Sequence, residues 1–361
     1  MYTPDDQRHM ARALELAARG LFTTTPNPRV GCVVVKDGVV AGEGWHEKAG
    51  ESHAEPMALQ AADGKAAGAT VYVTLEPCAH HGRTPPCVDA LLAAKPARVV
   101  AAIADPNPDT AGKGLEKLRA AGITVDVGLM DAEARELNIG FFARMTRGTP
   151  WVRMKVAASL DGRTALADGQ SQWITGDAAR KDGHAWRARA CAVLTGVGTV
   201  KSDDPQLNVR DVETTRQPLR VVVDSRLQTP LNARVLRPGT LFAAAGVDAP
   251  RSVALRARGA EVVVLPNHDG KVELPDLLQE LARRGCNEIH VEAGHKLNGS
   301  LLQAGLVDEL LIYMAPCILG DTAQGMFHLP PLAKLADRCN VRITDVQQIG
   351  ADLRVLARVD R

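Results

Sequence analysis

Residues 52–55 read Ser-His-Ala-Glu, and residues 76–87 read Glu-Pro-Cys-Ala-His-His-Gly-Arg-Thr-Pro-Pro-Cys. The imidazole of His53 and the thiols of Cys78 and Cys87 are three candidate ligands for one borderline-soft metal ion. Three protein ligands are typical of a catalytic zinc, since the fourth position stays open for water. Glu55 follows His53 closely enough to reach that water without binding the metal. The stretch therefore predicts an open zinc site with a carboxylate beside it.

The order of these residues favours hydrolytic deamination. A His-x-Glu sequence, a later Pro-Cys and a further cysteine are typical of zinc deaminases, in which the glutamate is not a ligand. Zinc would lower the pKa of bound water to about 7. Glu55 would take a proton from this water and later protonate the leaving amino group. The products would be a carbonyl and ammonia.

Other interpretations of the same residues remain open. Ser52 and Glu55 also fit a capping box, in which Glu55 would only bond the Ser52 N–H. His80 and His81 lie between the cysteines and could compete as ligands. The cysteines are further apart than in the compact Pro-Cys-x-x-Cys form. This spacing implies a longer loop, in which residues 82–84 would offer donors to an anionic substrate.

The first half of the chain alternates strands and helices. Apolar runs predict strands at 30–35, 39–41, 71–75, 98–104 and 123–127. Helical periodicity and capping residues predict helices at 3–20, 52–61, 88–95, 115–121 and 132–145. This alternation predicts a three-layer α/β sandwich. The proposed ligands then fall at helix starts beside strand ends, where unpaired N–H groups favour thiolate over thiol.

Length and composition limit the classes of protein to consider. The 361 residues suit two domains, and the pattern resets near Arg147-Gly148-Thr149-Pro150, which predicts domains at 1–147 and 148–361. Aromatic residues make up 3% and the net charge is +1, which argues against a nucleic-acid partner. No apolar run reaches about 18 residues, so no membrane span is expected.

The ends and the cysteines of the chain give expectations about its compartment. The first six residues are polar and acidic, so they are not expected to form a signal peptide. The seven cysteines are an odd number and mostly scattered singly. This usage favours a reducing cytoplasm with two metal thiolates over a disulfide framework.

The second half has the pattern of another α/β domain. Strands are expected at 151–158, 191–194, 220–223, 241–244, 261–265, 288–291 and 310–314, with a further pair in 342–358. Helices are expected at 177–190, 275–284 and 301–304. The Gly196-x-Gly198 turn does not complete a dinucleotide fingerprint, because position 201 is Lys. Residues 294–300 are the better candidate for a cofactor loop, since their glycines would let a backbone approach a diphosphate. These features alone indicate a domain that binds a phosphorylated ligand.

Nearly the whole chain resembles a known family, the bifunctional riboflavin-biosynthesis deaminase–reductases. In the first half the resemblance rests on residues 27–31 (Asn-Pro-Arg-Val-Gly), 53–55 and 76–87. The Gly-Arg-Thr-Pro-Pro-Cys spacing separates this family from cytidine and transfer-RNA adenosine deaminases. In the second half the resemblance rests on residues 158–163 (Ala-Ser-Leu-Asp-Gly-Arg), 171–175 (Ser-Gln-Trp-Ile-Thr), 203–205 (Asp-Asp-Pro) and 291–294 (Val-Glu-Ala-Gly).

The resemblance implies a cytidine-deaminase-like N-terminal domain and a dihydrofolate-reductase-like C-terminal domain, both of the α/β class. The first would use zinc to hydrolyse the 2-amino group of 2,5-diamino-6-ribosylamino-4(3H)-pyrimidinone 5′-phosphate. The second would use NADPH to reduce the ribosyl side chain, giving 5-amino-6-ribitylamino-uracil 5′-phosphate. This reductase fold does not use the missing dinucleotide fingerprint.

The resemblance also assigns residues to both sites. It implies zinc ligands at His53, Cys78 and Cys87, and a proton shuttle at Glu55. It implies deaminase substrate contacts at Asn27, His46 and Arg83. It implies NADPH contacts at Ala157, Trp173, Thr199, Asp203, Ser225, Gly294, His295, Lys296, Leu297, Asn298, Gly299 and Ser300. It implies reductase substrate contacts at Lys155, Ser171, Arg187, Leu207, Arg210 and Glu292. The planar guanidinium groups of Arg187 and Arg210 suit a phosphate.

Two rival functions remain open at this level. A nucleic-acid base deaminase with an appended domain would act on RNA, although the low aromatic content, the neutral charge and the long loop between the cysteines count against it. A binding protein with a structural zinc would need a closed site with four ligands. The family is usually oligomeric, which implies a homo-oligomer.

Overall fold

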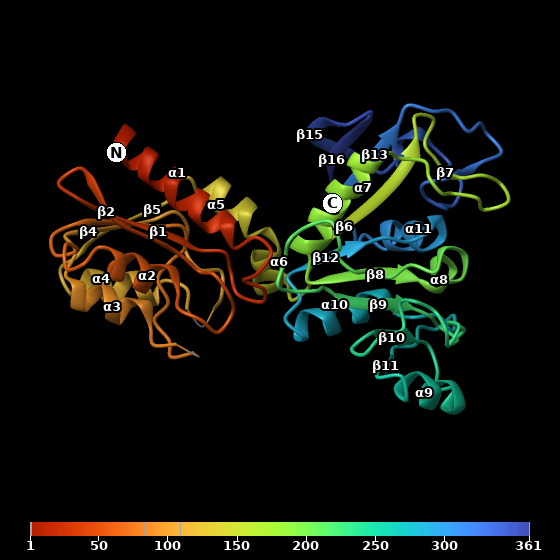
Figure 1. The fold of residues 1–361 in the computed structure, drawn as a ribbon, viewed down its shortest axis with the longest axis horizontal. Helices are drawn as coiled ribbons and strands as arrows, with labels where there is room; N and C mark the ends of the chain where they lie inside the picture. Colours follow the sequence, from red (N-terminus) through yellow and green to blue (C-terminus); the bar gives the residue numbers. More distant parts are fainter. Residues whose placement is uncertain (1, 83, 109, 361) are drawn as a thin grey trace. The chain divides into compact units, whose positions relative to one another are not determined.

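The computed structural model describes residues 2–82, 84–108 and 110–360 (Figure 1). The chain divides into two compact units, Met1–Thr149 and Pro150–Arg361, each with its own sheet and its own core. Within the described ranges, no helix combines the length and the apolar character that a bilayer span requires.

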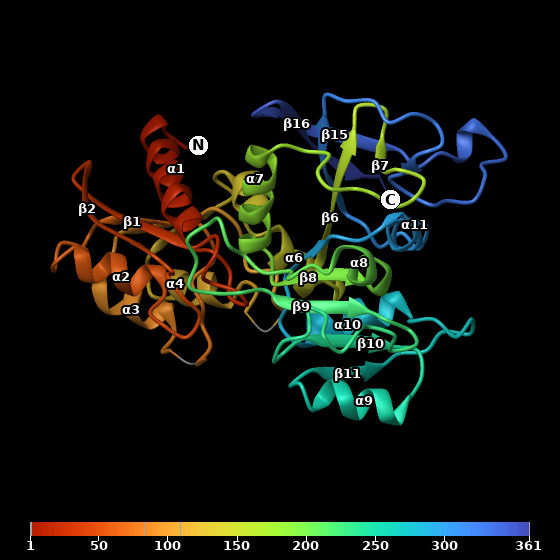
Figure 2. The same cartoon turned by 45° about the vertical axis from the view of Figure 1, so that its right-hand side comes forward.

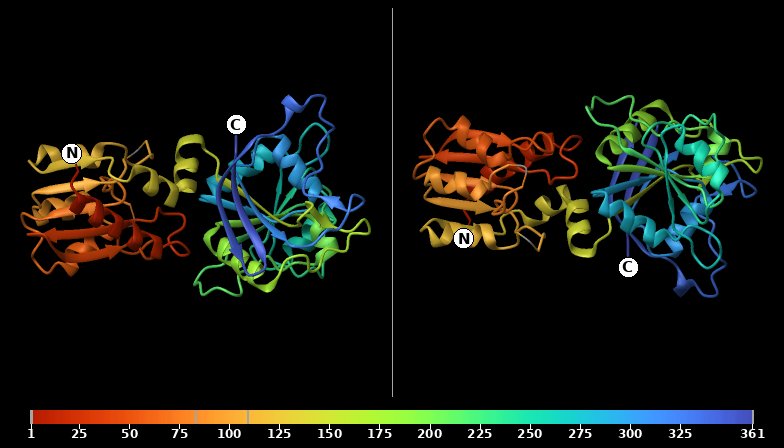
Figure 3. Two further views of the ribbon diagram at one scale, coloured as in Figure 1. Left: turned by 90° about the horizontal axis from the view of Figure 1, so that it is seen from above. Right: turned by 90° about the horizontal axis from the view of Figure 1, so that it is seen from below.

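The first unit is a five-stranded sheet with helices on both faces (Figures 1 and 3). Its strands are β1 (Gly31–Lys36), β2 (Val39–Trp45), β3 (Thr70–Val73), β4 (Arg98–Ala101) and β5 (Thr124–Val127). Its helices are α1 (Pro4–Arg19), α2 (Ala54–Ala61), α3 (Cys87–Ala94), α4 (Lys113–Ala120), α5 (Asp131–Leu137) and α6 (Ile139–Arg147). The strand order is β2-β1-β3-β4-β5; β1 is antiparallel to both neighbours, and β3, β4 and β5 are parallel.

Alternating strand residues divide the core of this unit into two layers. Val33 and Val100 pack with residues of α1, α5 and α6 on one face. Val34 and Val99 pack with residues of α2, α3 and α4 on the other face. Successive strand residues point to opposite faces, so a sheet with helices on both sides buries nearly every strand position. The three-layer α/β sandwich predicted for this half is therefore confirmed.

Helix α1 begins at the predicted capping residues. The Asp6 N–H donates to Thr3 Oγ1 at 3.1 Å, and Asp6 Oδ2 accepts the Thr3 N–H at 2.8 Å, which is a capping box. Asp6 Oδ1 also accepts bonds from the Tyr72 hydroxyl at 2.7 Å and from Arg98 at 2.6 Å. Burial opposes the ionisation of Asp6, but these donors outweigh it and hold its pKa well below the usual range.

Two helix predictions in this unit are wrong in detail. The helix expected at 132–145 is two helices, because the chain breaks at Asn138, where φ is −111° and ψ is 21°. Ser52 does not cap α2; His53 occupies the N-cap position, and its side chain makes no capping bond. The capping-box interpretation of Ser52 and Glu55 is therefore wrong, since His53 turns its ring to the cysteines instead.

The second unit is built on a nine-stranded sheet (Figures 1 and 2). Its strands are β6 (Trp151–Ser159), β7 (Arg163–Ala165), β8 (Ala192–Gly196), β9 (Leu219–Val223), β10 (Leu241–Ala244), β11 (Glu261–Val264), β12 (Glu288–Val291), β13 (Glu309–Ala315), β14 (Gln324–Gly325), β15 (Val341–Ile349) and β16 (Asp352–Val359). Its helices are α7 (Asp177–Arg189), α8 (Val197–Asp203), α9 (Ala249–Arg256), α10 (Leu274–Arg283) and α11 (His295–Gln303), with a short 3₁₀ helix at Leu335–Asp337.

The strand order of the large sheet is β11-β10-β9-β8-β12-β6-β13-β16-β15. The run from β11 to β13 is parallel, whereas β16 and β15 are antiparallel to their neighbours. Strands β7 and β14 form a separate two-stranded sheet. In a parallel sheet the ligand site lies outside the carboxyl ends of the strands. A ligand site is therefore expected beside the segments that follow β6, β8 and β12.

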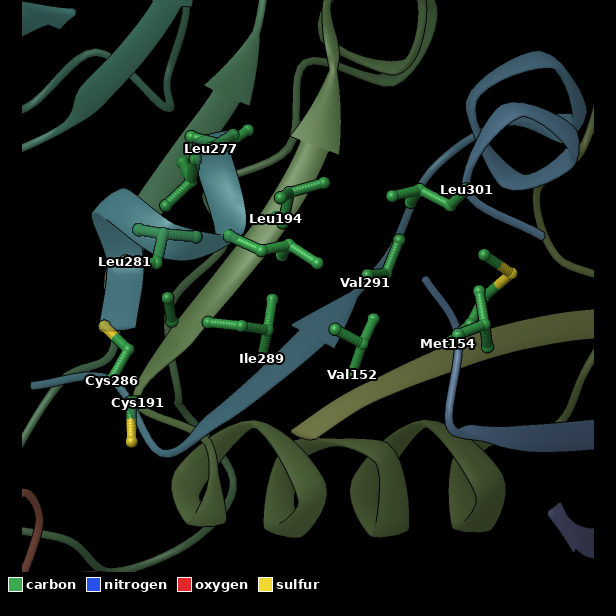
Figure 4. Close-up of a cluster of buried hydrophobic side chains, with 14 of the residues drawn as sticks. Val152, Met154, Cys191, Leu194, Leu277, Leu281, Cys286, Ile289, Val291 and Leu301 are labelled. Atoms are coloured by element: carbon green, nitrogen blue, oxygen red, sulfur yellow. The ribbon is translucent and has the colours of Figure 1, made fainter. Parts of the chain in front are cut away.

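One face of the large sheet is apolar. Val152 and Met154 of β6 and Ile289 of β12 form a cluster with Leu281 of α10 and Leu301 of α11 (Figure 4). All five side chains are at most 1% exposed. This cluster fixes β12 against α11, and so sets the position of the turn between them.

The opposite face of the same strands carries buried charge beneath α7. Arg153 alternates with Val152 and Met154 along β6, and its side chain is 1% exposed. It pairs with Glu288 of β12 at 3.1 Å and with Glu309 of β13, and its guanidinium lies 4.5 Å from the centre of the Trp186 ring of α7. Buried charges need close partners, because water does not solvate them there. This layer is therefore held by ion pairs.

The stretch 294–300, expected as a loop, is mostly helical. Helix α11 begins at His295, directly after its N-cap Gly294, so the helix expected at 301–304 is only the last part of a longer one. Gly299 lies against the His328 carbonyl with no room for a Cβ, and Asn298 Nδ2 donates to the Met326 carbonyl at 3.4 Å. The second half of the stretch therefore packs against protein, and its first turn has the N–H groups that, at any helix start, lack a partner inside the helix and can bind an anion.

Candidate functional site

Three side chains from different elements converge in the first unit. His53 precedes α2, Cys87 is the first residue of α3, and Cys78 lies in the segment after β3. Their ligand atoms all lie within 4.8 Å of one another. His53 Nδ1 is 3.3 Å from Cys87 Sγ and 3.6 Å from Cys78 Sγ. One imidazole nitrogen and two sulfurs at this spacing fit a zinc ion, whose bonds to such atoms are about 2.0–2.3 Å long.

The charges in this cluster favour a cation between the ligands. A hydrogen bond from Cys87 and the neighbouring His53 lower the pKa of Cys78, and the Cys87 N–H also donates to its sulfur at 3.3 Å. The pKa of Cys87 is raised, because its thiol donates a hydrogen bond to Cys78 and because it is buried. The hydrogen bond with Cys78 also raises the pKa of His53. Cys78 is thus the thiolate of the pair, and a thiolate is the form that binds metal.

Glu55 lies in the first turn of α2, beside the ligand cluster. Its side chain forms a hydrogen bond with Cys87, and the residue is 3% exposed. Burial and the charge of Cys78 raise the pKa of Glu55 to about 7. A carboxyl group with a pKa near neutral pH can both accept and return a proton.

Asn27 and His46 lie together at the same site. Asn27 Nδ2 is 3.1 Å from His46 Nε2, and His46 Nδ1 is 2.9 Å from the Ser52 carbonyl oxygen. The His46 ring meets the His53 ring edge-on, with centroids 5.1 Å apart. Two of the three deaminase contacts expected from the resemblance are therefore next to the ligand cluster. The third, Arg83, lies outside the described residues.

The histidines between the cysteines take other positions. His80 Nδ1 pairs with Thr110 Oγ1 at 3.2 Å, and His81 is exposed. The metal-ligand group found among the described residues consists of His53, Cys78 and Cys87.

Glu76 holds the segment that carries Cys78, a role that the sequence did not predict. Its carboxylate accepts the N–H groups of Asp105 at 3.1 Å, Gly112 at 3.0 Å and Gly114 at 3.0 Å. Gly114 also leaves no room for a Cβ beside the Pro77 carbonyl. The segment between β4 and α4 is thereby fixed against the residues before Cys78. Glu76 stood in the quoted motif, but its partners are far from it in sequence.

A second polar cluster lies in the second unit. Arg187 of α7 binds Glu292, at the end of β12, through two hydrogen bonds; Nη2 donates to Oε2 at 2.7 Å and Nε donates to Oε1. Lys155 of β6 is close enough to both that their charges act on it. Burial and the Arg187 charge lower the pKa of Lys155, and Glu292 opposes this effect. These three residues, all expected as reductase substrate contacts, are brought together by the fold.

His184 and Arg210 extend this cluster towards solvent. The Arg210 N–H donates to His184 Nδ1 at 3.3 Å, and the Arg210 side chain is held by Asn208 Oδ1 at 2.7 Å. Arg187 Nη1 donates to the Asn208 carbonyl at 3.1 Å. Burial, Arg187 and Arg210 lower the pKa of His184 to about 4. Asp211 Oδ2 lies 3.3 Å from His184 Nε2, and the exposed Arg210 guanidinium is a planar donor that suits a phosphorylated ligand.

Two glycine turns meet at the carboxyl ends of adjacent parallel strands. Gly196 is the last residue of β8 and the N-cap of α8, and Gly294 follows β12 and is the N-cap of α11. A Cβ on Gly294 would come within 3.7 Å of Thr199 Oγ1, and one on Gly196 within 3.2 Å of Leu297. Helix N-termini and close backbone approach are the features that a diphosphate requires. The Gly196 turn, the weaker candidate in the sequence, thus belongs to the same place as residues 294–300.

The remaining expected contacts are spread around these strand ends. Ala157 is near the end of β6, Asp203 ends α8, and Ser171 lies in the segment between β7 and α7. Trp173 is 70% exposed, with the Arg180 guanidinium 4.6 Å from its ring centre. Ser225 Oγ accepts the Val272 N–H at 3.2 Å. Leu207 is buried in the apolar cluster that also contains Val193 and Phe242, so its side chain faces the core.

Comparison with family models matches both units. Residues 150–355 match the RibD C-terminal domain. Residues 3–103 match the cytidine and deoxycytidylate deaminase zinc-binding region.

Curated proteins and solved structures resemble the chain over its whole length. The riboflavin biosynthesis protein RibD of Escherichia coli (strain K12) is 50% identical over 361 residues, covering 96% of this chain and 98% of the relative. The protein of the same name from Haemophilus influenzae is 46% identical, covering 98% and 97%. Acinetobacter baumannii RibD, form 1, superposes with a TM-score of 0.92 at 44% identity, covering 99% of each chain. A diaminohydroxyphosphoribosylaminopyrimidine deaminase/5-amino-6-(5-phosphoribosylamino)uracil reductase from Thermotoga maritima has a TM-score of 0.87 at 33% identity, covering 99% of each chain.

Proposed function

The chain belongs to the RibD family of bifunctional riboflavin-biosynthesis enzymes, and we propose where on this chain its two reactions take place. The enzyme is a zinc-dependent deaminase and an NADPH-dependent reductase. It deaminates 2,5-diamino-6-ribosylamino-4(3H)-pyrimidinone 5′-phosphate and then reduces the ribosyl side chain, giving 5-amino-6-ribitylamino-uracil 5′-phosphate. The first reaction is assigned to residues 1–147 and the second to residues 148–361.

The deaminase site is centred on His53, Cys78 and Cys87, which would hold the zinc ion. When bound there, zinc supplies Lewis-acid activation of a water molecule. Glu55 would accept a proton from a water molecule as the water oxygen bonds to C2, and would donate that proton to the 2-amino nitrogen as the C–N bond breaks and ammonia leaves. Its buried position beside Cys87 supports this role, because burial brings its pKa to about 7. Asn27 and His46 hold the pyrimidine, and Arg83 binds its anionic part.

The reductase site is centred on Arg187, Glu292 and Lys155. NADPH supplies a hydride to the ribosyl carbon when bound. Lys155 and Glu292 bind the sugar hydroxyl groups, and Arg187 keeps Glu292 ionised and fixed through its two hydrogen bonds. Arg210, exposed at the rim, binds the substrate phosphate together with Ser171 and the segment around Leu207.

The two glycine turns would hold NADPH. The first turns of α8 and α11 would offer N–H groups to its diphosphate, and Gly294 and Gly196 lie next to Thr199 and Leu297, respectively. Because Asn298 and Gly299 pack against Met326 and His328, the contacts from the 294–300 stretch come mainly from its beginning. Ala157, Trp173, Asp203 and Ser225 line the rest of the cofactor.

The enzyme works as a homo-oligomer in the cytoplasm. Strand β15 is the edge of the large sheet and exposes Val341, Ile343 and Val346 at 44%, 59% and 54%. A free edge strand with apolar side chains is a surface that a second copy can cover. The cysteines, all of which lie in the described ranges, form no disulfide, which supports a reducing compartment.

The observation that carries the deaminase assignment is the convergence of His53 with two thiols beside the buried Glu55. The test is to give the purified chain the diaminopyrimidine phosphate with and without NADPH and to identify the products by mass. Ammonia and the deaminated ribosyl compound are expected without NADPH, and the ribityl compound with it. No ammonia from this substrate, with release from cytosine or adenosine in RNA, would favour the rival base deaminase.

A further inference from the structure

We propose that Asn138 is a positioning residue for deamination, which holds the main chain of Arg29 and thereby places Asn27 at the substrate. Asn138 lies in neither group of proposed site residues and is more than a hundred positions away from Arg29 in sequence. The inference rests on the proposed role of Asn27 as a substrate contact.

The Asn138 side chain binds both main-chain groups of a single residue. Its Oδ1 accepts the Arg29 N–H at 2.8 Å, and its Nδ2 donates to the Arg29 carbonyl at 2.8 Å. Asn138 is 1% exposed and Arg29 is 5% exposed, so water does not compete for these bonds. The amide therefore pairs with the Arg29 main chain as a neighbouring strand would, because it satisfies both the N–H and the carbonyl of that residue.

Two further bonds hold the same segment against the same helices. Arg29 Nη1 donates to the Leu137 carbonyl at 2.7 Å, and Arg144 Nη2 reaches the Pro26 carbonyl at 3.4 Å. Pro26 and Pro28 have no N–H to donate, so the segment around Asn27 offers few donors of its own. Besides the Asn27 N–H, which donates to the Thr24 carbonyl at 2.9 Å, the segment is held by these bonds to the junction of α5 and α6.

Loss of the Asn138 side chain should affect the position of Asn27 more than the positions of the metal ligands. Asn27 is two residues from Arg29, and its Nδ2 is 3.1 Å from His46 Nε2. The metal ligands belong to α2, α3 and the segment after β3, which Glu76 holds independently. Releasing Arg29 should therefore displace Asn27 and leave the zinc site intact.

Only an amide fits this position. An aspartate of the same size offers acceptors alone and would set a carboxylate oxygen against the Arg29 carbonyl. A leucine or alanine offers neither group and leaves a buried N–H and carbonyl unpaired. The requirement for one donor and one acceptor explains why Asn interrupts the helical pattern here.

The test compares Asn138→Ala, Asn27→Ala and the double variant in the full-length enzyme. For Asn138→Ala, KM of deamination is expected to rise about tenfold, as for loss of a buried hydrogen bond, with one zinc per chain and normal NADPH oxidation on the deaminated substrate. In the Asn27→Ala background, Asn138→Ala is expected to raise KM no further, because both substitutions act through the Asn27 side chain. Thr146→Ala, at an exposed position of the helix α6 that follows Asn138, is the matched control and should leave KM unchanged.

The outcomes separate this inference from the assignment it rests on. If Asn27→Ala raises KM but Asn138→Ala does not, or if the two effects multiply, the positioning role is wrong and the Asn27 contact stands. If Asn27→Ala leaves KM unchanged, the Asn27 contact is wrong and the inference falls with it. Should Asn138→Ala lose zinc, Asn138→Asp repeats the test; zinc loss in both variants would make Asn138 a structural residue only.

Discussion

The Gly114 N–H donates to Glu76 Oε1 at 3.0 Å, at a point where the Gly114 backbone is pressed against the Pro77 carbonyl. A Cβ at position 114 would therefore collide with backbone, which cannot turn away. Gly114→Ala is expected to displace the segment that carries Cys78, at a cost of about 1–3 kcal/mol. Zinc content and deamination should both fall, and reduction should be spared.

The measurement is zinc per chain by metal analysis, with both activities assayed on the same sample. Gly183→Ala is the control, because a Cβ there meets nothing within 4 Å. Full zinc content in Gly114→Ala would show that the Glu76 segment does not position Cys78.

Glu55→Ala should separate metal binding from chemistry. Since Glu55 is not among the converging ligand atoms, zinc should stay bound. Loss of a positioned proton acceptor should slow ammonia release by about 100- to 10,000-fold. Reduction of substrate that is already deaminated should be normal. Near-normal ammonia release would end the assignment of Glu55 as the proton shuttle.

Removal of zinc by a chelator should stop deamination and leave reduction intact, because each unit has its own core. Added zinc should restore ammonia release. The assay follows ammonia and NADPH oxidation in parallel. Loss of both activities would mean that the metal also supports the second unit.

Arg187→Lys keeps the positive charge but cannot reproduce the two parallel hydrogen bonds to Glu292. Loss of one charge-assisted bond corresponds to about 1.5–3 kcal/mol. We expect kcat/KM for reduction to fall roughly 10- to 100-fold, and deamination by the same chain to be unaffected. Equal loss of both activities would indicate misfolding instead.

The pKa of Asp6 predicts a pH dependence of stability. Its folded pKa lies below its unfolded value of about 3.9. The stabilisation is therefore fully present above that unfolded value and is lost as pH falls towards the folded pKa. Asp6→Asn should lower the melting temperature of the first unit at pH 7, and the gap from the unchanged protein should narrow below about pH 4. Calorimetry of metal-free protein avoids a contribution from zinc release; a gap that stays constant down to pH 3 would refute the linkage.

The sequence could predict what local spacing controls. His53, Cys78 and Cys87 converge because each stands at a helix start or a strand end, and such positions can be predicted from nearby residues. The alternation of strands and helices predicted both α/β units for the same reason. Helix α1 could be predicted from Thr3 and Asp6, which bond each other across one turn.

Contacts between distant parts of the chain could not be predicted in this way. Glu76 finds its partners some thirty to forty positions away, and Arg187 meets Glu292 across 105 positions. The break at Asn138 was missed because apolar residues continue the helical spacing on both sides of it, while the partner of its amide lies in another segment. The reductase site residues could be predicted only from the family resemblance, since no local sequence pattern shows that Lys155 lies near Arg187 and Glu292.

The buried ion pairs of Arg153 with Glu288 and Glu309 have a consequence for how this fold can vary. Arg189 also pairs with Glu288 at 2.7 Å, and Arg358 pairs with Glu309 at 3.4 Å, so the network extends beyond these three residues. Removing either glutamate alone would leave buried guanidinium groups short of a partner, whereas exchanging the whole network for apolar side chains of matched volume can be neutral or stabilising. Substitutions at the positions of this buried network should therefore occur together, and single substitutions should be rare. Across related sequences, Arg153, Glu288 and Glu309 should covary with Arg189 and Arg358, and a redesign of this layer should replace the network as a whole.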